Sequence, residues 1–130
     1  MILSTLLALA PAVQEPAIDC DNAGTQFELN ACAYKDYERA DAAMNAQWKI
    51  TAARMKGLDA KFDPAQDDRP GYFDTLLAAQ RAWLDYRDKH CTSAGYSMRG
   101  GSAEPMVVGG CQAELTDART QQLKALIEEY

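Results

Sequence analysis

Four cysteines constrain this chain more than any other feature of its sequence. They are Cys20, Cys32, Cys91 and Cys111, and an apolar run over residues 1–12 resembles a secretion signal. Cysteines of exported proteins form disulfides in an oxidising compartment, whereas those of cytosolic proteins stay reduced. Four cysteines allow three pairings, of which proximity along the chain favours Cys20 with Cys32 and Cys91 with Cys111. The sequence therefore predicts a small exported domain with structural disulfides.

The N-terminal segment has an apolar core from Ile2 to Ala10 and a small residue at Ala12, where a signal peptidase would cut. The run is far shorter than the roughly 20 residues of a membrane-spanning helix. We expect residues 1–12 to be a signal peptide and residues 13–130 to form one domain in the periplasm or outside the cell. The alternatives are a short buried N-terminal helix and a start codon further upstream.

A zinc site is the other use that four cysteines can have. The intervening stretches of 11, 58 and 19 residues lack the short paired spacing that zinc motifs show. Disulfides are the favoured interpretation, and we expect no metal and no cofactor.

Helical signals cover most of the remaining chain. Thr25 and Glu28 have the spacing of a capping box, which places a helix start near Gln26, and Gly57 is a candidate stop. Between them, one apolar stripe recurs at intervals of three or four residues: Leu29, Ala33, Tyr37, Ala40, Met44, Trp48, Ala52 and Met55. An acidic, turn-rich connection is expected over residues 58–71, with further helices over 72–90 and 112–128.

The segment 92–110 is rich in Gly, Ser and Met and has no helical period. We expect a long loop there, tethered at its ends by Cys91 and Cys111, with a short strand over 106–108 as an option. The predicted fold class is all-α, a small bundle of three main helices, one of them long, with this Gly-rich loop.

Long polar side chains lie on the inner face predicted for the second main helix. Gln80, Trp83 and Arg87 share that face, with Tyr86 beside them. They form either a surface that binds a ligand or a part of the core in which the polar side chains are hydrogen-bonded. The core interpretation is favoured. We expect Arg87 or Arg119 to hold backbone carbonyls of the loop, because a guanidinium carries five donors.

Charge and motifs exclude several functions. The formal net charge of −6 disfavours nucleic acid and anionic membranes and suits a basic partner. The chain has one histidine, and it has neither a Ser-His-Asp order nor a phosphate-binding glycine loop. We therefore expect a binding protein and not an enzyme.

A family resemblance extends over nearly the whole domain. The residues that carry it are Cys20, Thr25, Glu28, Asn30 and Cys32, Ala40-Asp41 with Met44-Asn45, Ala79-Gln80-Arg81-Ala82-Trp83, Tyr86-Arg87-Asp88 with Cys91, Gly100-Gly101-Ser102, Cys111, Thr116, Arg119 and Leu123. In these residues the chain resembles the LprI-like lysozyme-inhibitor family. The resemblance implies a small, mostly helical bacterial envelope domain with four cysteines. No cysteine directly follows the signal, so we expect a free protein and not a lipid-anchored one.

The resemblance and the acidic charge together suggest inhibition of a basic lysozyme-type muramidase. Such an enzyme works with two carboxylates in a cleft, which a protruding segment can fill. The candidate partner-binding residues lie in the expected loop: Tyr96, Ser97, Met98, Arg99 and Ser102. The alternative is a disulfide-stapled structural or interaction module that binds through the surface of the first helix or the acidic stretch 59–74.

Overall fold

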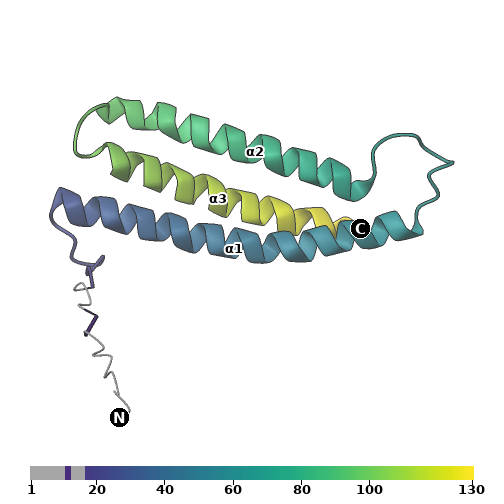
Figure 1. The fold of residues 1–130 in the computed structure, drawn as a ribbon, viewed down its shortest axis with the longest axis horizontal. Coiled ribbons are helices and arrows are strands. Elements are labelled where there is room, and N and C mark those ends of the chain that lie inside the picture. Colours follow the sequence, from purple (N-terminus) through teal and green to yellow (C-terminus); the bar gives the residue numbers. More distant parts are fainter. Residues whose placement is uncertain (1–10, 13–16) are drawn as a thin grey trace, which may run out of the picture.

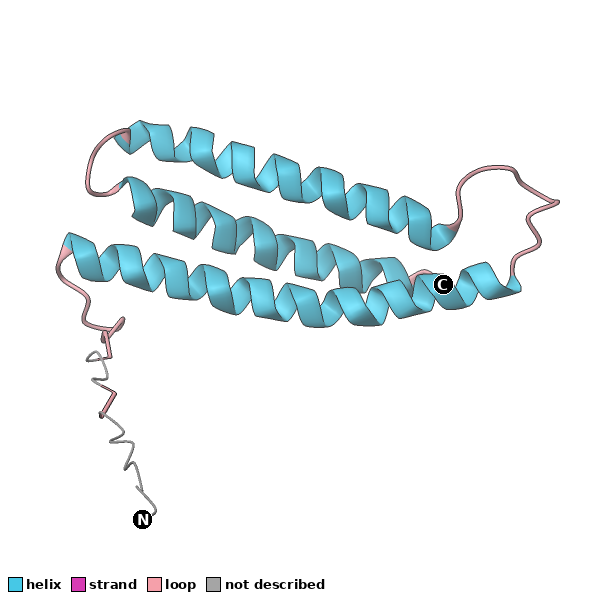
Figure 2. Cartoon of the chain, viewed as in Figure 1, coloured by secondary structure: helices cyan, strands magenta, loops and turns pink. Residues whose placement is uncertain are grey.

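The protein is a bundle of three helices lying side by side (Figure 1). The computed structural model describes residues 11–12 and 17–130, so the predicted signal segment lies outside the described residues except for its last two. The elements are α1 (Gln26–Lys61), α2 (Tyr72–Gly95), the short 3-10 helix η1 (Tyr96–Met98) and α3 (Glu104–Glu128). The described residues contain no strand, and the predicted all-α bundle with one long helix is confirmed (Figure 2).

The predicted capping box starts α1. The Thr25 hydroxyl accepts a hydrogen bond from the Glu28 amide at 3.2 Å, and the Glu28 carboxylate accepts one from the Thr25 amide at 3.0 Å. The expected stop at Gly57 is wrong, because α1 continues to Lys61. Leu58, which packs against the core, gives this last turn a tertiary contact that offsets the low helix propensity of glycine.

The long loop expected over residues 92–110 is also wrong. Helix α2 continues to Gly95, η1 follows it directly, and α3 begins at Glu104, so only residues 99–103 are irregular. The optional strand over 106–108 lies within α3 and is helical. Two of the glycines that suggested a loop, Gly95 and Gly109, are points of close packing between helical residues. A Cβ atom on Gly109 would lie 3.1 Å from the Ala33 backbone.

The core is small and rich in polar side chains. Its apolar cluster consists of Met44, Ala52, Met55, Leu76 and Leu123. The eight residues of the predicted stripe on α1 all face inward, four of them buried and four partly buried. Buried threonines satisfy their hydroxyls inside the bundle: Thr51 of α1 donates to the Leu123 carbonyl of α3 at 2.9 Å, and Thr120 donates to the Thr116 carbonyl at 3.1 Å.

Two disulfides fasten one end of this bundle. They join Cys20 to Cys32 and Cys91 to Cys111, which is the pairing that proximity along the chain favours. The first ties the segment before α1 onto that helix, and the second joins α2 to the start of α3. In the loop-closure model each contributes on the order of 3 kcal/mol, a large share of the stability of a domain with so modest a core.

Helix α2 takes its N-terminal cap from α1. Its N-cap residue, Gly71, has no side chain to offer, and the Asp59 carboxylate accepts from the amides of Tyr72 at 2.7 Å and Phe73 at 3.0 Å. A Cβ on Gly71 would lie 2.6 Å from an Asp59 oxygen. Because Gly71 has no Cβ, the Asp59 carboxylate can reach the first amides of α2. This contact between α1 and α2 fixes the direction in which α2 starts after the connection.

The close approach of α1 and α3 predicts opposite effects for two adjacent glycines. Gly109→Ala forces the two backbones apart and should lower the free energy of unfolding by about 1–3 kcal/mol. Gly110→Ala, at an exposed helical position with nothing within 4 Å, should raise it by about 0.5–1 kcal/mol. Urea unfolding measures both, and equal changes would contradict the close packing at Gly109.

The Asp59 cap predicts a second stability effect. Asp59→Ala leaves the first amides of α2 without an acceptor and should cost about 1 kcal/mol in urea unfolding. Asp68→Ala, in the same connection and exposed, is the matched control and should change little. If the two variants lose equal stability, the cap contributes nothing beyond surface charge.

Candidate partner-binding surface

The five residues predicted to contact a partner lie together at the disulfide end of the bundle. Tyr96, Ser97 and Met98 form η1, and Arg99 and Ser102 follow in the turn to α3; all are exposed. Figure 1 shows this turn at the same end as the start of α1, opposite the α1–α2 connection. The predicted residues therefore do protrude, although from a tight turn and not from a long loop.

The turn is held in one shape by its own hydrogen bonds. Gly100 has φ 76°, a left-handed conformation that glycine adopts without strain, and its amide donates to the Glu104 carboxylate at 2.8 Å. The Gly101 amide donates to the Met98 carbonyl at 2.8 Å. The Arg99 guanidinium lies over the Tyr96 ring, 4.4 Å from its centre. Such a preorganised turn loses little conformational entropy on binding.

Helix α1 supplies a second part of this surface that sequence reasoning missed. The side-chain Nδ2 of Asn30 donates to the Ser102 backbone carbonyl at 2.8 Å and so joins the turn to α1. Phe27 and Tyr34 are exposed by 76% and 57%, and they lie seven residues apart on one side of α1. Their position off the apolar stripe was the available signal, since large aromatic residues on a solvent face mark binding surfaces.

A shallow depression lies between these two parts. It has a volume of about 490 Å³. Its lining residues are Asn30, Tyr34, Gly100, Gly101, Glu104, Pro105, Val108, Gly109 and Gln112. We call the depression together with Phe27, Tyr34, Tyr96, Met98 and Arg99 the turn surface. Tyr, Phe, Met and Arg are residue types that protein interfaces favour.

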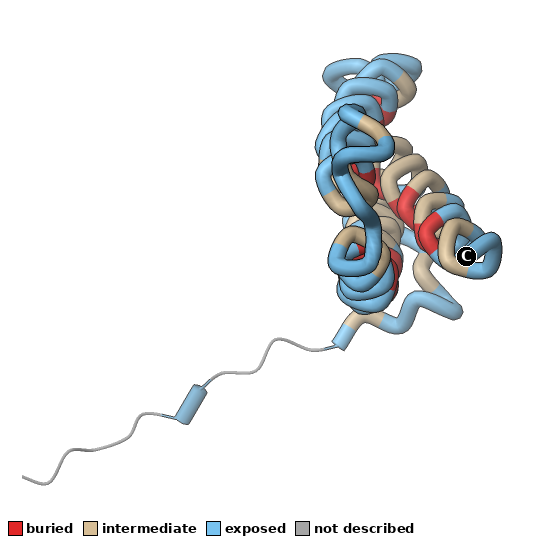
Figure 3. The backbone as a smooth tube through the Cα atoms, turned by 90° about the vertical axis from the view of Figure 1, so that its right-hand side faces the viewer, coloured by how far each residue is buried: buried red, intermediate tan, exposed pale blue. Residues whose placement is uncertain are grey.

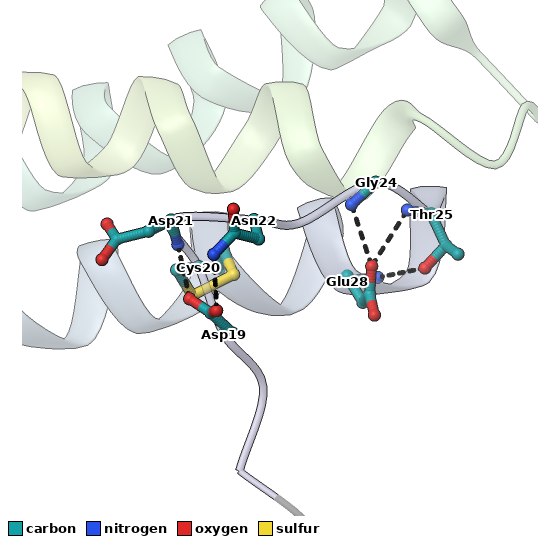
Figure 4. The surroundings of a disulfide bond; sticks show 8 residues. Asp19, Cys20, Asp21, Asn22, Gly24, Thr25 and Glu28 are labelled. Atoms are coloured by element: carbon teal, nitrogen blue, oxygen red, sulfur yellow. Dashed lines mark hydrogen bonds between the residues drawn. A yellow bond between two sulfur atoms is a disulfide. The ribbon is translucent and has the colours of Figure 1, made fainter.

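Asp19, in the segment before α1, and Glu28, in the first turn of α1, add negative charge at this end (Figure 4). Hydrogen bonds from the Thr25 and Gly24 amides lower the pKa of Glu28. Bonds from the Asn22 side chain and the Asp21 amide lower the pKa of Asp19, next to the Cys20–Cys32 disulfide. Both carboxylates are therefore held in the charged form.

The polar cluster on α2 lies in the middle of the bundle, away from the turn surface. Arg87, with a side chain exposed by only 5%, donates to Asp88 at 3.0 Å and to the Thr116 hydroxyl at 3.3 Å, and it lies 3.7 Å from Asp41. Its guanidinium is also 5.1 Å from the ring centre of Trp83. One buried cation thus contacts all three helices.

Neither arginine holds the segment 92–110, so that expectation is wrong. Arg119 donates to the side-chain oxygen Oε1 of Gln80 at 2.9 Å, and the partners of Arg87 are Asp41, Asp88 and Thr116. The physical reason is that residues 92–110 are mostly helical and bond their own carbonyls. Tyr86, grouped with this cluster in the sequence, is 55% exposed and stacks on His90 at 5.3 Å.

In the described part of the chain, no group of three or more His, Cys, Asp or Glu side chains is arranged to hold a metal ion. The helices described above include none with a stretch long and apolar enough to cross a membrane.

Comparison with known proteins gives one family and one relative. A family model described as "Lysozyme inhibitor LprI" matches residues 19–123. An uncharacterized protein of Rhizobium meliloti (strain 1021) is 46% identical over 128 residues, which cover 97% of this chain and 92% of that protein. No solved structure matches. The matched residues include both disulfides, the Arg87 cluster and the turn surface.

The lowered pKa of Glu28 predicts how the disulfide end responds to acid. A carboxyl whose pKa is lower in the folded state stabilises the fold above its ordinary pKa of 4.5, and this contribution is lost as pH falls through the folded value. Glu28→Ala should therefore lower Tm at neutral pH, and the difference from the unsubstituted protein should shrink in acid. Glu38→Ala, exposed in the middle of α1, is the control. A difference that stays constant with pH would contradict the role of the Glu28 charge.

Proposed function

This chain belongs to the LprI family of lysozyme inhibitors, and from that premise we propose that it is an exported envelope protein that binds and inhibits a lysozyme-type muramidase. The single observation that carries the proposal is the family match, which spans residues 19–123 and so nearly all of the described domain. Two structural disulfides agree with an oxidising, extracytoplasmic location. The partner is then a protein, and the interaction needs no cofactor.

Charge supports a basic lysozyme as that partner. The chain carries a formal net charge of −6, and opposite net charges raise the rate of encounter between two proteins. This contribution weakens with salt, because the Debye length falls to about 8 Å at physiological ionic strength. Inhibition that persists at that salt must rest on short-range contacts.

The turn surface is the part of the molecule best suited to those contacts. It protrudes from the end of the bundle, and its turn is fixed by hydrogen bonds and anchored by the Cys91–Cys111 disulfide. Arg99 offers donors that match a pair of carboxylates in a glycosidase cleft. Tyr96 and Met98, each 49% exposed, offer apolar area beside it. Blocking the cleft by this turn requires no chemical step.

Arg99→Ala is the decisive substitution. It removes the charged donor and should raise the inhibitor concentration for half-inhibition of cell-wall hydrolysis about tenfold, equivalent to about 1.4 kcal/mol. The assay uses a basic animal-type lysozyme and the oxidised protein without residues 1–12, at low and physiological salt. Arg81→Ala, at another exposed arginine on α2, is the charge-matched control and should leave inhibition unchanged.

Two results would contradict parts of this proposal. If the unsubstituted protein fails to inhibit at either salt, lysozyme inhibition is wrong, and the alternative of a disulfide-stapled envelope module takes its place. If it inhibits but Arg99→Ala inhibits equally well with an unchanged Tm, the family function holds and the turn surface is the wrong site.

A further inference from the structure

A second concave site lies at the end of the bundle opposite the turn surface. It is a groove of about 950 Å³ between α2 and α3, closed off by the α1–α2 connection. Figure 3 looks at this end and shows α3 to one side of the other two helices. The lining residues are Met55, Asp59, Phe62, Pro64, Asp67, Arg69, Pro70, Gly71, Tyr72, Thr75, Leu76, Ala79, Arg119, Leu126 and Tyr130. A volume of this size is typical of small-molecule sites.

The walls of the groove are mainly apolar. Met55, Leu76 and Leu126 come from three different helices and line its interior. At one end of the groove, the Tyr72 ring packs edge-on against the rings of Phe62 and Tyr130, with centres 5.9 Å apart in both pairs. Such a surface binds an apolar body and offers it little hydrogen bonding.

One cation in the lining has no counter-charge. The Arg119 guanidinium donates to the neutral amides of Gln80 at 2.9 Å and Gln122 at 3.1 Å, and its Nη2 atom is buried without a hydrogen-bond partner. Among the described residues, no carboxylate lies within ion-pair distance of it. Burial accordingly lowers the pKa of Arg119.

The acidic residues of the groove are already engaged elsewhere. Asp59 caps α2 through two backbone amides, and Asp67 forms an ion pair with Arg69. Neither neutralises Arg119. A partly buried guanidinium without a counter-charge is costly, so a ligand that brings a carboxylate would gain a charge-assisted hydrogen bond there.

We propose that this groove binds a long-chain fatty-acid anion, with the acyl chain along Met55, Leu76 and Leu126 and the carboxylate on Arg119. The carboxylate replaces Gln122, an exposed side chain, at the guanidinium. The stretch of α3 from Arg119 to Glu128 rises about 14 Å, which is close to the length of an extended twelve-carbon chain. This site is independent of lysozyme inhibition, because it lies at the other end of the bundle.

Calorimetric titration with three single-chain amphiphiles tests the head-group assignment. The probes are dodecanoate, dodecanol and dodecyltrimethylammonium, the two ions below their micelle concentrations and the alcohol below its solubility limit. Dodecanoate should bind about tenfold more tightly than dodecanol, since one charged hydrogen bond separates them, and the cation should bind most weakly. Equal affinity for the acid and the alcohol would overturn the role of Arg119, and no binding of dodecanoate would overturn the site.

Two neighbouring alanines of α2 test the location. Ala79 lines the groove and Ala78 does not, while both are exposed helical residues. Ala79→Trp should fill the groove and weaken dodecanoate binding about tenfold or more, while Ala78→Trp should leave it unchanged. Equal binding by the two variants would place the ligand elsewhere.

Arg119→Met completes the test, with the circular dichroism spectrum and Tm confirming that it folds. Arg119→Met should abolish the preference for dodecanoate over dodecanol. A retained preference would overturn the assignment of the carboxylate to Arg119. If Arg119→Met does not fold, the comparison of Ala79→Trp with Ala78→Trp still tests the groove. Ala79→Trp should inhibit lysozyme as the unsubstituted protein does. Failure of fatty-acid binding and failure of lysozyme inhibition are therefore distinguishable.

Discussion

The buried guanidinium of Arg87 is the constraint on which the arrangement of the three helices depends. A charge with a side chain only 5% exposed must be paired, and its partners come from every helix: Asp41 of α1, Asp88 of α2 and Thr116 of α3. Asp41 and Asp88 are themselves 38% and 58% exposed, so water screens both pairs, and removing either carboxylate should cost less than the loss of one member of a fully buried pair. The helices are therefore held in one register by a polar contact and not only by apolar packing.

The close packing of α1 against α3 is a second constraint on the arrangement of the helices. Gly109 lets the α3 backbone approach Ala33, and buried threonines occupy positions where most bundles carry large apolar residues. Small side chains bring the backbones together but remove little apolar surface from water. The two disulfides offset this deficit, and both lie near the turn surface. The rigid end of the molecule is thus the end proposed to meet a protein partner.

Local signals were readable from the sequence, and contacts between distant segments were not. The capping box of Thr25 and Glu28, the stripe on α1 and the start of α2 at Tyr72 each depend on neighbouring residues, and each was predicted correctly. Residues 92–110 were mistaken for a loop because glycine has a low helix propensity, whereas Gly109 serves close packing. Likewise, spacing along the chain does not reveal that Asn30 bonds the Ser102 carbonyl.

The Arg87 cluster also separates the two concave sites. The turn surface lies at the disulfide end, the groove lies at the end where α1 turns into α2, and the cluster joins all three helices between them. A ligand at Arg119 competes with the exposed Gln122, while Gln80 keeps a second contact to Met44 Sδ at 3.5 Å. The turn that carries Arg99 is held by its own hydrogen bonds and by Asn30, none of which involves a residue of the groove. The two concave sites also share no lining residue, so a ligand in the groove does not contact the surface proposed to meet a lysozyme.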